Sequence, residues 1–451
     1  VSQFEILAGF ILLLLGWVFV PFYLRSGVYT MPEFLELRYS KGARTYLTII
    51  SIIAYVLTKI SVTIKAGGIV FEALGINFWI GAVAIVVITG LYTILGGLRA
   101  VIYTDMIQMI VLIGGALTVT LFGLSAIDGW EALMTKTETG FMEIWKPVSH
   151  PDFPWTGIIF GAPILGVWYW CTDQFIVQRV LSANGIDQAR RGTIFGGFLK
   201  MTPLFIFVIP GVIAYVMSQE GTLQLPAGET DQALPLLMQS LLPVGLRGLV
   251  VAGLLAALMS SLSSVFNSCS TLITWDLYKK LHPRASERRL VWVGKIATAV
   301  LVLLGIAWIP LIDDISEQLF TYLQSVQGYI SPPIAAVFLL GIFSKRLNGQ
   351  GAMAALLSGF VLGTLRLIAE LNADALSGWM HTFATVNFLH FAVFLFIFRT
   401  AVLIIVSLLT AKPEVAKVRE LVYEPRNFKL VKLVRKPEFW WSIGLLAIIA
   451  F

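Results

Sequence analysis

The chain has 451 residues, of which 57% are hydrophobic and only 13% are charged. This composition excludes an ordinary water-soluble protein and is typical of a polytopic helical membrane protein, since helices satisfy their own backbone hydrogen bonds in lipid. The net charge of +6 does not indicate a nucleic-acid partner, because the cationic residues gather in certain loops between apolar runs.

Twelve apolar runs are long enough to cross a bilayer, which takes about twenty residues each. They fall at about 6–25, 45–73, 78–95, 101–126, 155–183, 195–218, 246–276, 290–310, 316–344, 350–370, 381–410 and 438–451. We therefore expect an all-α fold, with a single transmembrane domain of about twelve helices over residues 1–451.

The loops between these runs alternate in charge. Basic residues gather at 25–44, 99, 190–191, 279–289, 345–346 and 412–436, whereas acidic residues gather at 128–143, 220–231, 313–317 and 370–374. The positive-inside rule predicts that the basic loops are cytoplasmic. Residue 1 would then lie outside the cell, although it is not Met and no signal peptide precedes it. We expect at least one further helix upstream.

The run 155–183 carries a polar cluster at its centre, in the sequence Trp168–Gln174. A carboxylate such as Asp173 at bilayer depth usually marks a substrate or ion path. Neighbouring aromatic and amide side chains offer the ring faces and hydrogen bonds that a small polar solute needs. Pro163 and nearby glycines favour an interrupted helix here. This pattern predicts a transporter with a central site for a polar solute.

A serine cluster, MSSLSSVFNS, interrupts the run 246–276. Ser260, Ser263 and Ser264 share one helix face, and the carbonyl of Ala257 lies one turn before Ser261. Hydroxyl and carbonyl oxygens are suitable ligands for a small hard cation such as sodium. The alternative is close helix packing, which serine-rich faces also permit.

Several other polar residues lie inside apolar runs, and each leaves two interpretations open. Asp105 is either an ion ligand or the partner of an arginine. Glu5 is an interfacial anchor or a solute contact, and Lys200 either extends to the cytoplasmic surface or donates to the central site. Gln324 and Gln327 lie on one run and favour a cavity lining.

The sequence resembles the sodium/glucose cotransporters of the sodium:solute symporter family over essentially its whole length. The segments that carry the resemblance are TMPEFLELRY (30–39), LYTILGGLRAVIYTDMIQ (91–108), WYWCTDQFIVQRVLSA (168–183), LRGLVVAGLLAALMSSLSSVFNSCSTLITWDLY (246–278) and SPPIAAVFLLGIFSKR (331–346). WYWCTDQ followed by IVQR is closer to the sugar and inositol branch than to proline or pantothenate carriers.

The resemblance implies a leucine-transporter-type fold of two inverted five-helix repeats, with sodium and solute bound at their interface. Residues 1–126 would form the rest of the first repeat, 155–344 the second repeat, and 345–451 peripheral helices. The first run would match the second core helix, so we expect the first core helix to be missing and the 451-residue chain alone not to transport.

The resemblance also implies two sodium sites. Ala257, Ser260 and Ser261 match the main site, whereas Asp105, Ser263 and Ser264, together with Ser260, match the second site of those members that have one. The resemblance therefore implies two sodium ions, and no other cofactor is expected.

Five side chains match sugar-contacting positions of the family: Glu5, Tyr169, Trp170, Lys200 and Gln324. The Tyr169 ring would lie under the sugar as an inner gate. Two positions depart from the pattern, because Gly166 stands where relatives have Asn or Thr, and Gln327 where some have Thr. Both changes would alter hydroxyl recognition.

The sequence is therefore interpreted as a sodium-coupled symporter of a sugar or polyol in the plasma membrane, with no required protein partner. Alternatives are a carrier for inositol or an acidic sugar, and a sugar-gated sensor or leak channel without coupled uptake. An enzyme is not expected, since no set of nucleophile, base and oxyanion donors is visible.

Overall fold

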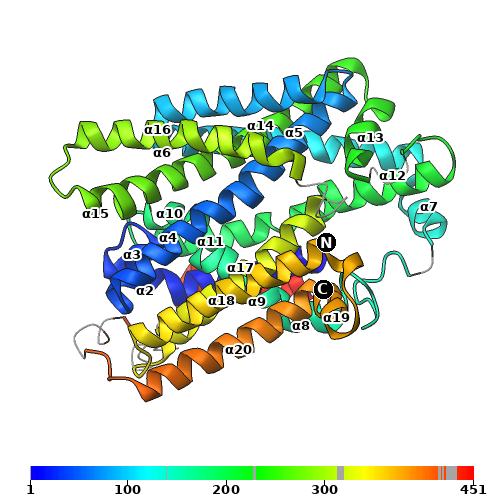
Figure 1. Cartoon of the computed structure of the whole chain (residues 1–451). Helices are drawn as coiled ribbons and strands as arrows, with labels where there is room; N and C mark the ends of the chain where they lie inside the picture. Colours follow the sequence, from blue (N-terminus) through cyan, green and yellow to red (C-terminus); the bar gives the residue numbers. More distant parts are fainter. Residues whose placement is uncertain are drawn as a thin grey trace.

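The computed structural model describes residues 2–138, 140–226, 230–311, 319–414, 418, 421–422 and 434–450, except for the side chains at 73, 96–101 and 311. The side chain of Arg99 and the charged residues at 229, 313–317, 417, 419 and 426–432 fall outside this part of the chain. Within it, the chain forms a bundle of long helices that run side by side (Figure 1).

Ten helices in the described part of the chain are long and apolar enough to span a membrane. They are Ser2–Ser26, Lys41–Glu72, Phe78–Leu95, Ile102–Ala126, Ile186–Gln219, Val244–Leu281, Glu287–Trp308, Leu319–Phe343, Gly349–Leu371 and Phe388–Leu409. The predicted fifth run is a broken helix, described below, and the last is the shorter helix α23 (Pro437–Ala450). In the described part of the chain, each of the twelve predicted runs is helical over most of its length.

Several spans contain a π-helical segment. The first span comprises α1 (Ser2–Leu14), η1 (Leu15–Phe19) and α2 (Val20–Ser26), and the second comprises α4 (Lys41–Tyr55), η2 (Val56–Ile60) and α5 (Ser61–Ala73). Later spans comprise α11 (Ile186–Leu199), η4 (Leu204–Val208) and α12 (Ile209–Gln219), then α14 (Val244–Thr271), η6 (Leu272–Tyr278) and α15 (Lys279–Leu281). Such π-bulges occur frequently at functional sites.

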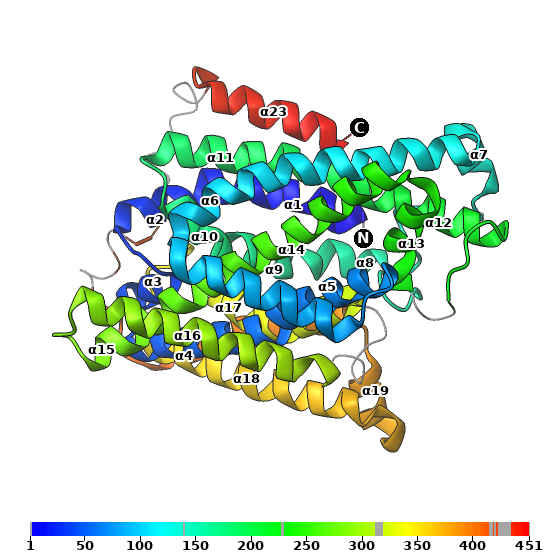
Figure 2. The ribbon, with the colours of Figure 1, turned by 90° about the horizontal axis from the view of Figure 1, so that it is seen from above.

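The other helices are continuous. They are α3 (Met31–Arg38), α6 (Phe78–Ala126), α7 (Gly129–Lys136), α13 (Ala233–Leu241), α16 (Glu287–Trp308), α17 (Leu319–Phe343), α18 (Gly349–Leu371), α19 (Gly378–Thr385) and α20 (Phe388–Leu409), with 3₁₀ turns η5 (Thr230–Gln232), η7 (Ile309–Leu311) and η8 (Ala373–Ala375). The helix α6 holds two spans, which form the separate light-blue and cyan legs in Figure 2.

One predicted boundary was wrong. The run 381–410 does not form one helix, because Val386 and Asn387 are extended and separate α19 from α20. The side-chain oxygen of Asn387 accepts a hydrogen bond of 3.0 Å from the amide of Leu389, which caps the new helix.

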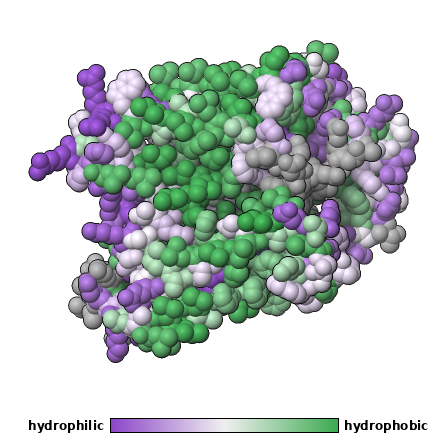
Figure 3. All heavy atoms as spheres, viewed as in Figure 1, coloured by the Kyte–Doolittle hydropathy of each residue, from purple (hydrophilic) through white to green (hydrophobic). Residues whose placement is uncertain are grey.

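The elements next to the basic loops gather at one end of the bundle. The helices α2, α3 and α15 and the start of α16 lie at the left in Figure 1, whereas α7, α12, α13 and α19 lie at the right. Between the two ends runs a broad apolar belt, and hydrophilic residues gather toward both ends (Figure 3). This is the arrangement of a helical bundle that crosses a membrane.

Two apolar cores meet at the centre of the bundle. Trp168 and Cys171 belong to a buried cluster with side chains of α1, α3 and α17. Phe175 belongs to a second cluster, with side chains of α4, α5, α6, α14 and α16. Asp173 therefore lies in the short stretch of chain that passes from one core to the other.

Candidate functional site

The fifth span is broken into four pieces: α8 (Trp155–Phe160), α9 (Ala162–Gly166), the π-helical segment η3 (Val167–Thr172) and α10 (Gln174–Leu181). Pro163 lies in the first turn of α9, where its missing N–H costs no helical hydrogen bond. Asp173 is extended, with φ −78° and ψ 127°, and separates η3 from α10. The interrupted helix predicted from prolines and glycines is confirmed.

Asp173 has a structural role at this break. Its carboxylate accepts a 3.1 Å hydrogen bond from the Phe175 amide and so caps α10. The carboxylate also accepts a hydrogen bond from the Tyr55 hydroxyl and forms an ion pair with Lys59. Asp173 is only 4% exposed, so its charge is compensated inside the protein.

The structure brings Glu5, at the start of the first span, together with two other predicted solute contacts, Lys200 and Trp170. The ammonium of Lys200 lies 2.5 Å from a carboxylate oxygen of Glu5 and 5.6 Å from the centroid of the Trp170 ring. Tyr169 and Trp170 contact each other edge to face, with centroids 5.0 Å apart. Lys200 therefore does not extend to a surface but pairs with Glu5 beside the aromatic residues of η3.

The elements that carry these residues pack on one another, since η3 contacts both α1 and α17. The rings of Phe4 and Phe320 lie 6.0 Å apart, which fixes the start of α17 against the start of α1. Gln324 is one turn beyond Phe320 and is half-buried, whereas Gln327 is 4% exposed. The predicted amides thus belong to the same side of the bundle as Glu5.

Gly166 marks a close approach between the broken span and the first span. A Cβ atom at Gly166 would overlap the Cδ1 methyl of Ile11, a buried residue of α1. Space that a longer side chain would use at position 166 is therefore filled by hydrocarbon from α1. This contact was not predicted, because nothing in the local sequence pairs the two positions.

The second predicted sodium site is assembled around Asp105 on α6. Ser260 of α14 donates a hydrogen bond to one carboxylate oxygen of Asp105, and the Arg179 guanidinium lies 2.8 Å from the other. Arg179 also donates to the Ser264 hydroxyl. Of the two alternatives for Asp105, the structure contains the partner of an arginine. Ser263 is fully buried and donates to the Ser260 carbonyl over 2.9 Å.

The residues of the main predicted sodium site are less buried than those around Asp105. Ala257 and Ser260 are half-buried on the uninterrupted helix α14, but Ser261 on the same helix is exposed. The three residues share consecutive turns, which keeps the Ala257 carbonyl near Ser261. Ser261 therefore faces open space, unlike the buried pair Ser263 and Ser264.

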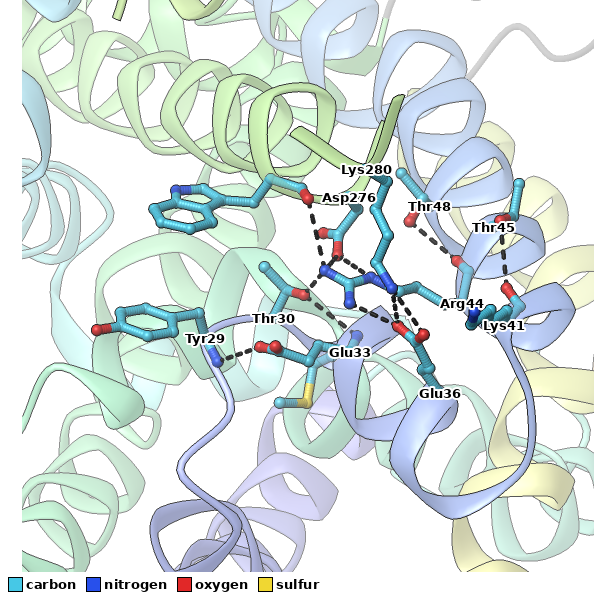
Figure 4. Close-up of polar contacts among 12 residues, drawn as sticks. Tyr29, Thr30, Glu33, Glu36, Lys41, Arg44, Thr45, Thr48, Asp276 and Lys280 are labelled. Atoms are coloured by element: carbon cyan, nitrogen blue, oxygen red, sulfur yellow. Dashed lines mark hydrogen bonds and ion pairs between the residues drawn. The ribbon is translucent and has the colours of Figure 1, made fainter. Parts of the chain in front are cut away.

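The basic end of the bundle is joined by a charged network that the sequence analysis did not identify (Figure 4). Arg44 of α4 pairs with Glu36 of α3 at 2.6 Å and with Asp276 of η6 at 2.5 Å. Lys280 reaches Glu36 at 2.6 Å, and Thr30 donates to Asp276 at 3.0 Å. The network connects the α3–α4 segment to η6, which directly follows the serine face of α14.

Charge compensation lowers the pKa of Glu36, which lies outside the spans. Burial alone would raise the pKa of its carboxyl, but hydrogen bonds and charges from Lys280 and Arg44 outweigh burial and hold the pKa below the usual 4.5. Glu36 is therefore an anion at neutral pH, as the network requires.

Sequence reasoning missed two functional candidates, Arg179 and Tyr55, and did not identify the partner of Lys59. Arg179 and Lys59 carry charges inside apolar runs, and such residues usually face the protein interior and require partners. That rule could have singled them out, but it could not have named Asp105 and Asp173 as their respective partners.

Comparison with known proteins gives consistent matches. Residues 1–359 match the sodium:solute symporter family. The sodium/mannose cotransporter of Bos taurus is 41% identical, covering 94% of this chain and 77% of its own length. Sodium/glucose cotransporter 1 of Ovis aries is 39% identical, with 94% and 70% covered, and the sodium/myo-inositol cotransporter of Mus musculus is 38% identical, with 96% and 66% covered.

A solved structure is also similar. The substrate-bound, outward-open state of a Na⁺-coupled sialic acid symporter aligns with a TM-score of 0.73 and 26% identity, covering 91% of this chain and 84% of that one. The alignment confirms the expected all-α, leucine-transporter-type fold.

Proposed function

Because the chain belongs to the sodium:solute symporter family, we propose that it couples sodium entry to uptake of a sugar or polyol by alternating access. One observation carries this proposal most directly. The broken span places a polar, aromatic cluster on η3 and a carboxylate–hydroxyl cluster around Asp105 on opposite sides of the break at Asp173. A solute site and a cation site would thus share one broken span.

The solute site would consist of Glu5, Tyr169, Trp170, Lys200 and Gln324. Glu5 and Lys200 form an ion pair, so together they offer both hydrogen-bond donors and acceptors without a net charge. This favours a neutral polyhydroxylated solute over an acidic sugar. The solute would be further selected by Gln327 and by the apolar contact of Gly166 with Ile11.

The sodium sites would lie along α14. Ala257, Ser260 and Ser261 would supply oxygens to the main site, and Asp105, Ser263 and Ser264 to the second. Two ions entering at a potential of about 100 mV contribute roughly 4.6 kcal/mol, which is over a thousandfold in solute accumulation. Residues 1–126 and 155–344 would belong to the two inverted repeats, and residues 345–451 would be peripheral.

The membrane would be the plasma membrane, with the basic end of the bundle in the cytoplasm. The clustering of basic loops at one end supports this orientation.

Uptake by the reconstituted full-length protein tests the proposal. We expect that liposomes with an inward sodium gradient accumulate at least one labelled sugar or polyol from a panel of glucose, galactose, mannose and myo-inositol. Replacing sodium by choline should abolish accumulation. Solute movement that only equilibrates across the membrane would instead indicate a leak channel, and binding without movement would indicate a sensor.

Ser261→Ala tests the main sodium site. The substitution removes one of about five oxygen ligands, so the sodium concentration for half-maximal uptake should rise severalfold while the maximal rate at saturating sodium changes little. Because the Ser261 side chain is exposed, a packing defect would not explain a rise in the sodium concentration for half-maximal uptake. Ser240→Ala, an exposed serine on α13, is the matched control. Unchanged sodium dependence would leave the serine cluster with a packing role only.

A further inference from the structure

Lys59 lies deep in the bundle, in the π-helical segment η2, and is 8% exposed. Its ammonium contacts the carboxylate of Asp173 and lies among aromatic rings. The distances from the nitrogen to the ring centroids are 4.2 Å for Phe175, 4.6 Å for Tyr169 and 4.8 Å for Tyr55. A desolvated cation over ring faces is strongly attracted by them, so its position is well defined.

The ion pair joins two spans at the break of the fifth. Asp173 caps α10 and accepts from Tyr55 of α4, so its carboxylate is fixed by three donors from two directions. The ammonium compensates the charge of this carboxylate inside the protein. The pair fixes the end of η3 relative to the second span.

Tyr169 is held by this arrangement. It lies one helical turn before Asp173, its ring contacts the Lys59 ammonium at 4.6 Å, and Trp170 packs edge to face against it at 5.0 Å. The ring is half-buried, so part of it remains accessible. A ring that stacks on a solute must keep one orientation, and here a charged group on a neighbouring span restricts it.

We propose that Lys59 is a positioning residue for solute recognition, which acts through Tyr169 by holding its ring in the orientation that the solute contacts. The proposal rests on the proposed function, in which Tyr169 is a solute contact. By this proposal the second span also determines solute affinity. It does so through Lys59, which does not touch the solute itself.

The test uses neutral variants, because Lys59→Met alone would leave the buried Asp173 without a partner. In Lys59→Met/Asp173→Asn, the asparagine can still cap α10 and accept from Tyr55, but the cation over the ring is lost. We expect the solute concentration for half-maximal uptake to rise about two- to thirtyfold, with unchanged sodium dependence. The single variant Lys59→Arg keeps the positive charge beside Asp173, so it should retain most of the solute affinity of the unmodified protein. Amounts in the membrane are measured for each variant.

A double-mutant cycle with Tyr169→Ala separates positioning from general damage. Tyr169→Ala should weaken solute affinity severely and Tyr169→Phe only mildly, because the ring face is the contact. Adding Lys59→Met/Asp173→Asn to Tyr169→Ala should cause no further loss. If the double variant does not reach the membrane, Lys59→Gln/Asp173→Asn, which can form an amide hydrogen bond, replaces it in the same cycle.

The outcomes distinguish the two proposals. Additive losses, or a shift in sodium dependence without a shift in solute affinity, would overturn the role of Lys59 while leaving the proposed function intact. Equal effects of Tyr169→Ala and Tyr169→Phe would assign the contact to the phenolic hydroxyl and overturn ring positioning. No sodium-driven uptake by the unmodified full-length protein would overturn the proposed function itself.

Discussion

Asp105→Asn is expected to lower the ratio of sodium to solute from two toward one. The substitution removes the single carboxylate of the proposed second site and leaves the Arg179 guanidinium, 2.8 Å from it, without its counter-charge. An uncompensated cation at that position repels sodium. Each sodium ion lost at a potential of about 100 mV removes roughly 2.3 kcal/mol, so the steady-state accumulation should fall about fiftyfold.

Reversal-potential measurements in proteoliposomes give the ratio directly. Asp374→Asn is a suitable control, since Asp374 is an exposed carboxylate at the other end of the bundle. A ratio of one in the unmodified protein would remove the second sodium site. A ratio of two in Asp105→Asn would show that Asp105 serves only to hold Arg179 and Ser260.

Gln324→Ala is expected to weaken solute affinity by about ten- to a hundredfold. The amide can donate and accept at once, and a buried solute hydroxyl that loses its partner costs about 1–3 kcal/mol. Glu5→Ala should have a similar effect, with an added cost because it leaves Lys200 unpaired. Gln324→Glu should retain more affinity than Gln324→Ala, since it keeps the acceptor.

Solute-dependent quenching of tryptophan fluorescence measures this affinity apart from transport. Gln219→Ala, an exposed glutamine at the end of α12, is the matched control. An affinity in Gln324→Ala within twofold of the unmodified protein would exclude Gln324 from the solute site.

The sequence predicted those features that depend on local signals. Apolar runs of spanning length indicated where the described spans lie, and Pro163 with its neighbouring glycines indicated the break in the fifth. The split between α19 and α20 was missed, because the cap at Asn387 lies inside an apolar run and changes hydrophobicity very little.

Contacts between distant residues could not be predicted in the same way. Lys59 and Asp173 are 114 residues apart, and Arg179 and Asp105 are 74 apart. Burial of a charge implies that it has a partner, but which partner it has depends on how the spans pack. For the same reason Asp105 remained open between two interpretations until its neighbours were known.

The close approach of Ile11 to Gly166, a proposed solute position, constrains which side chains position 166 can gain during evolution. The family resemblance implies Asn or Thr at position 166, but any side chain there would meet the Cδ1 methyl of Ile11. Ile11→Val removes only that methyl group and so makes room for a side chain at position 166. We therefore expect Ile11→Val to come before the replacement of Gly166 by Asn or Thr. Mutational order would therefore matter, and lineages that exchange one solute for another should vary at the two positions together.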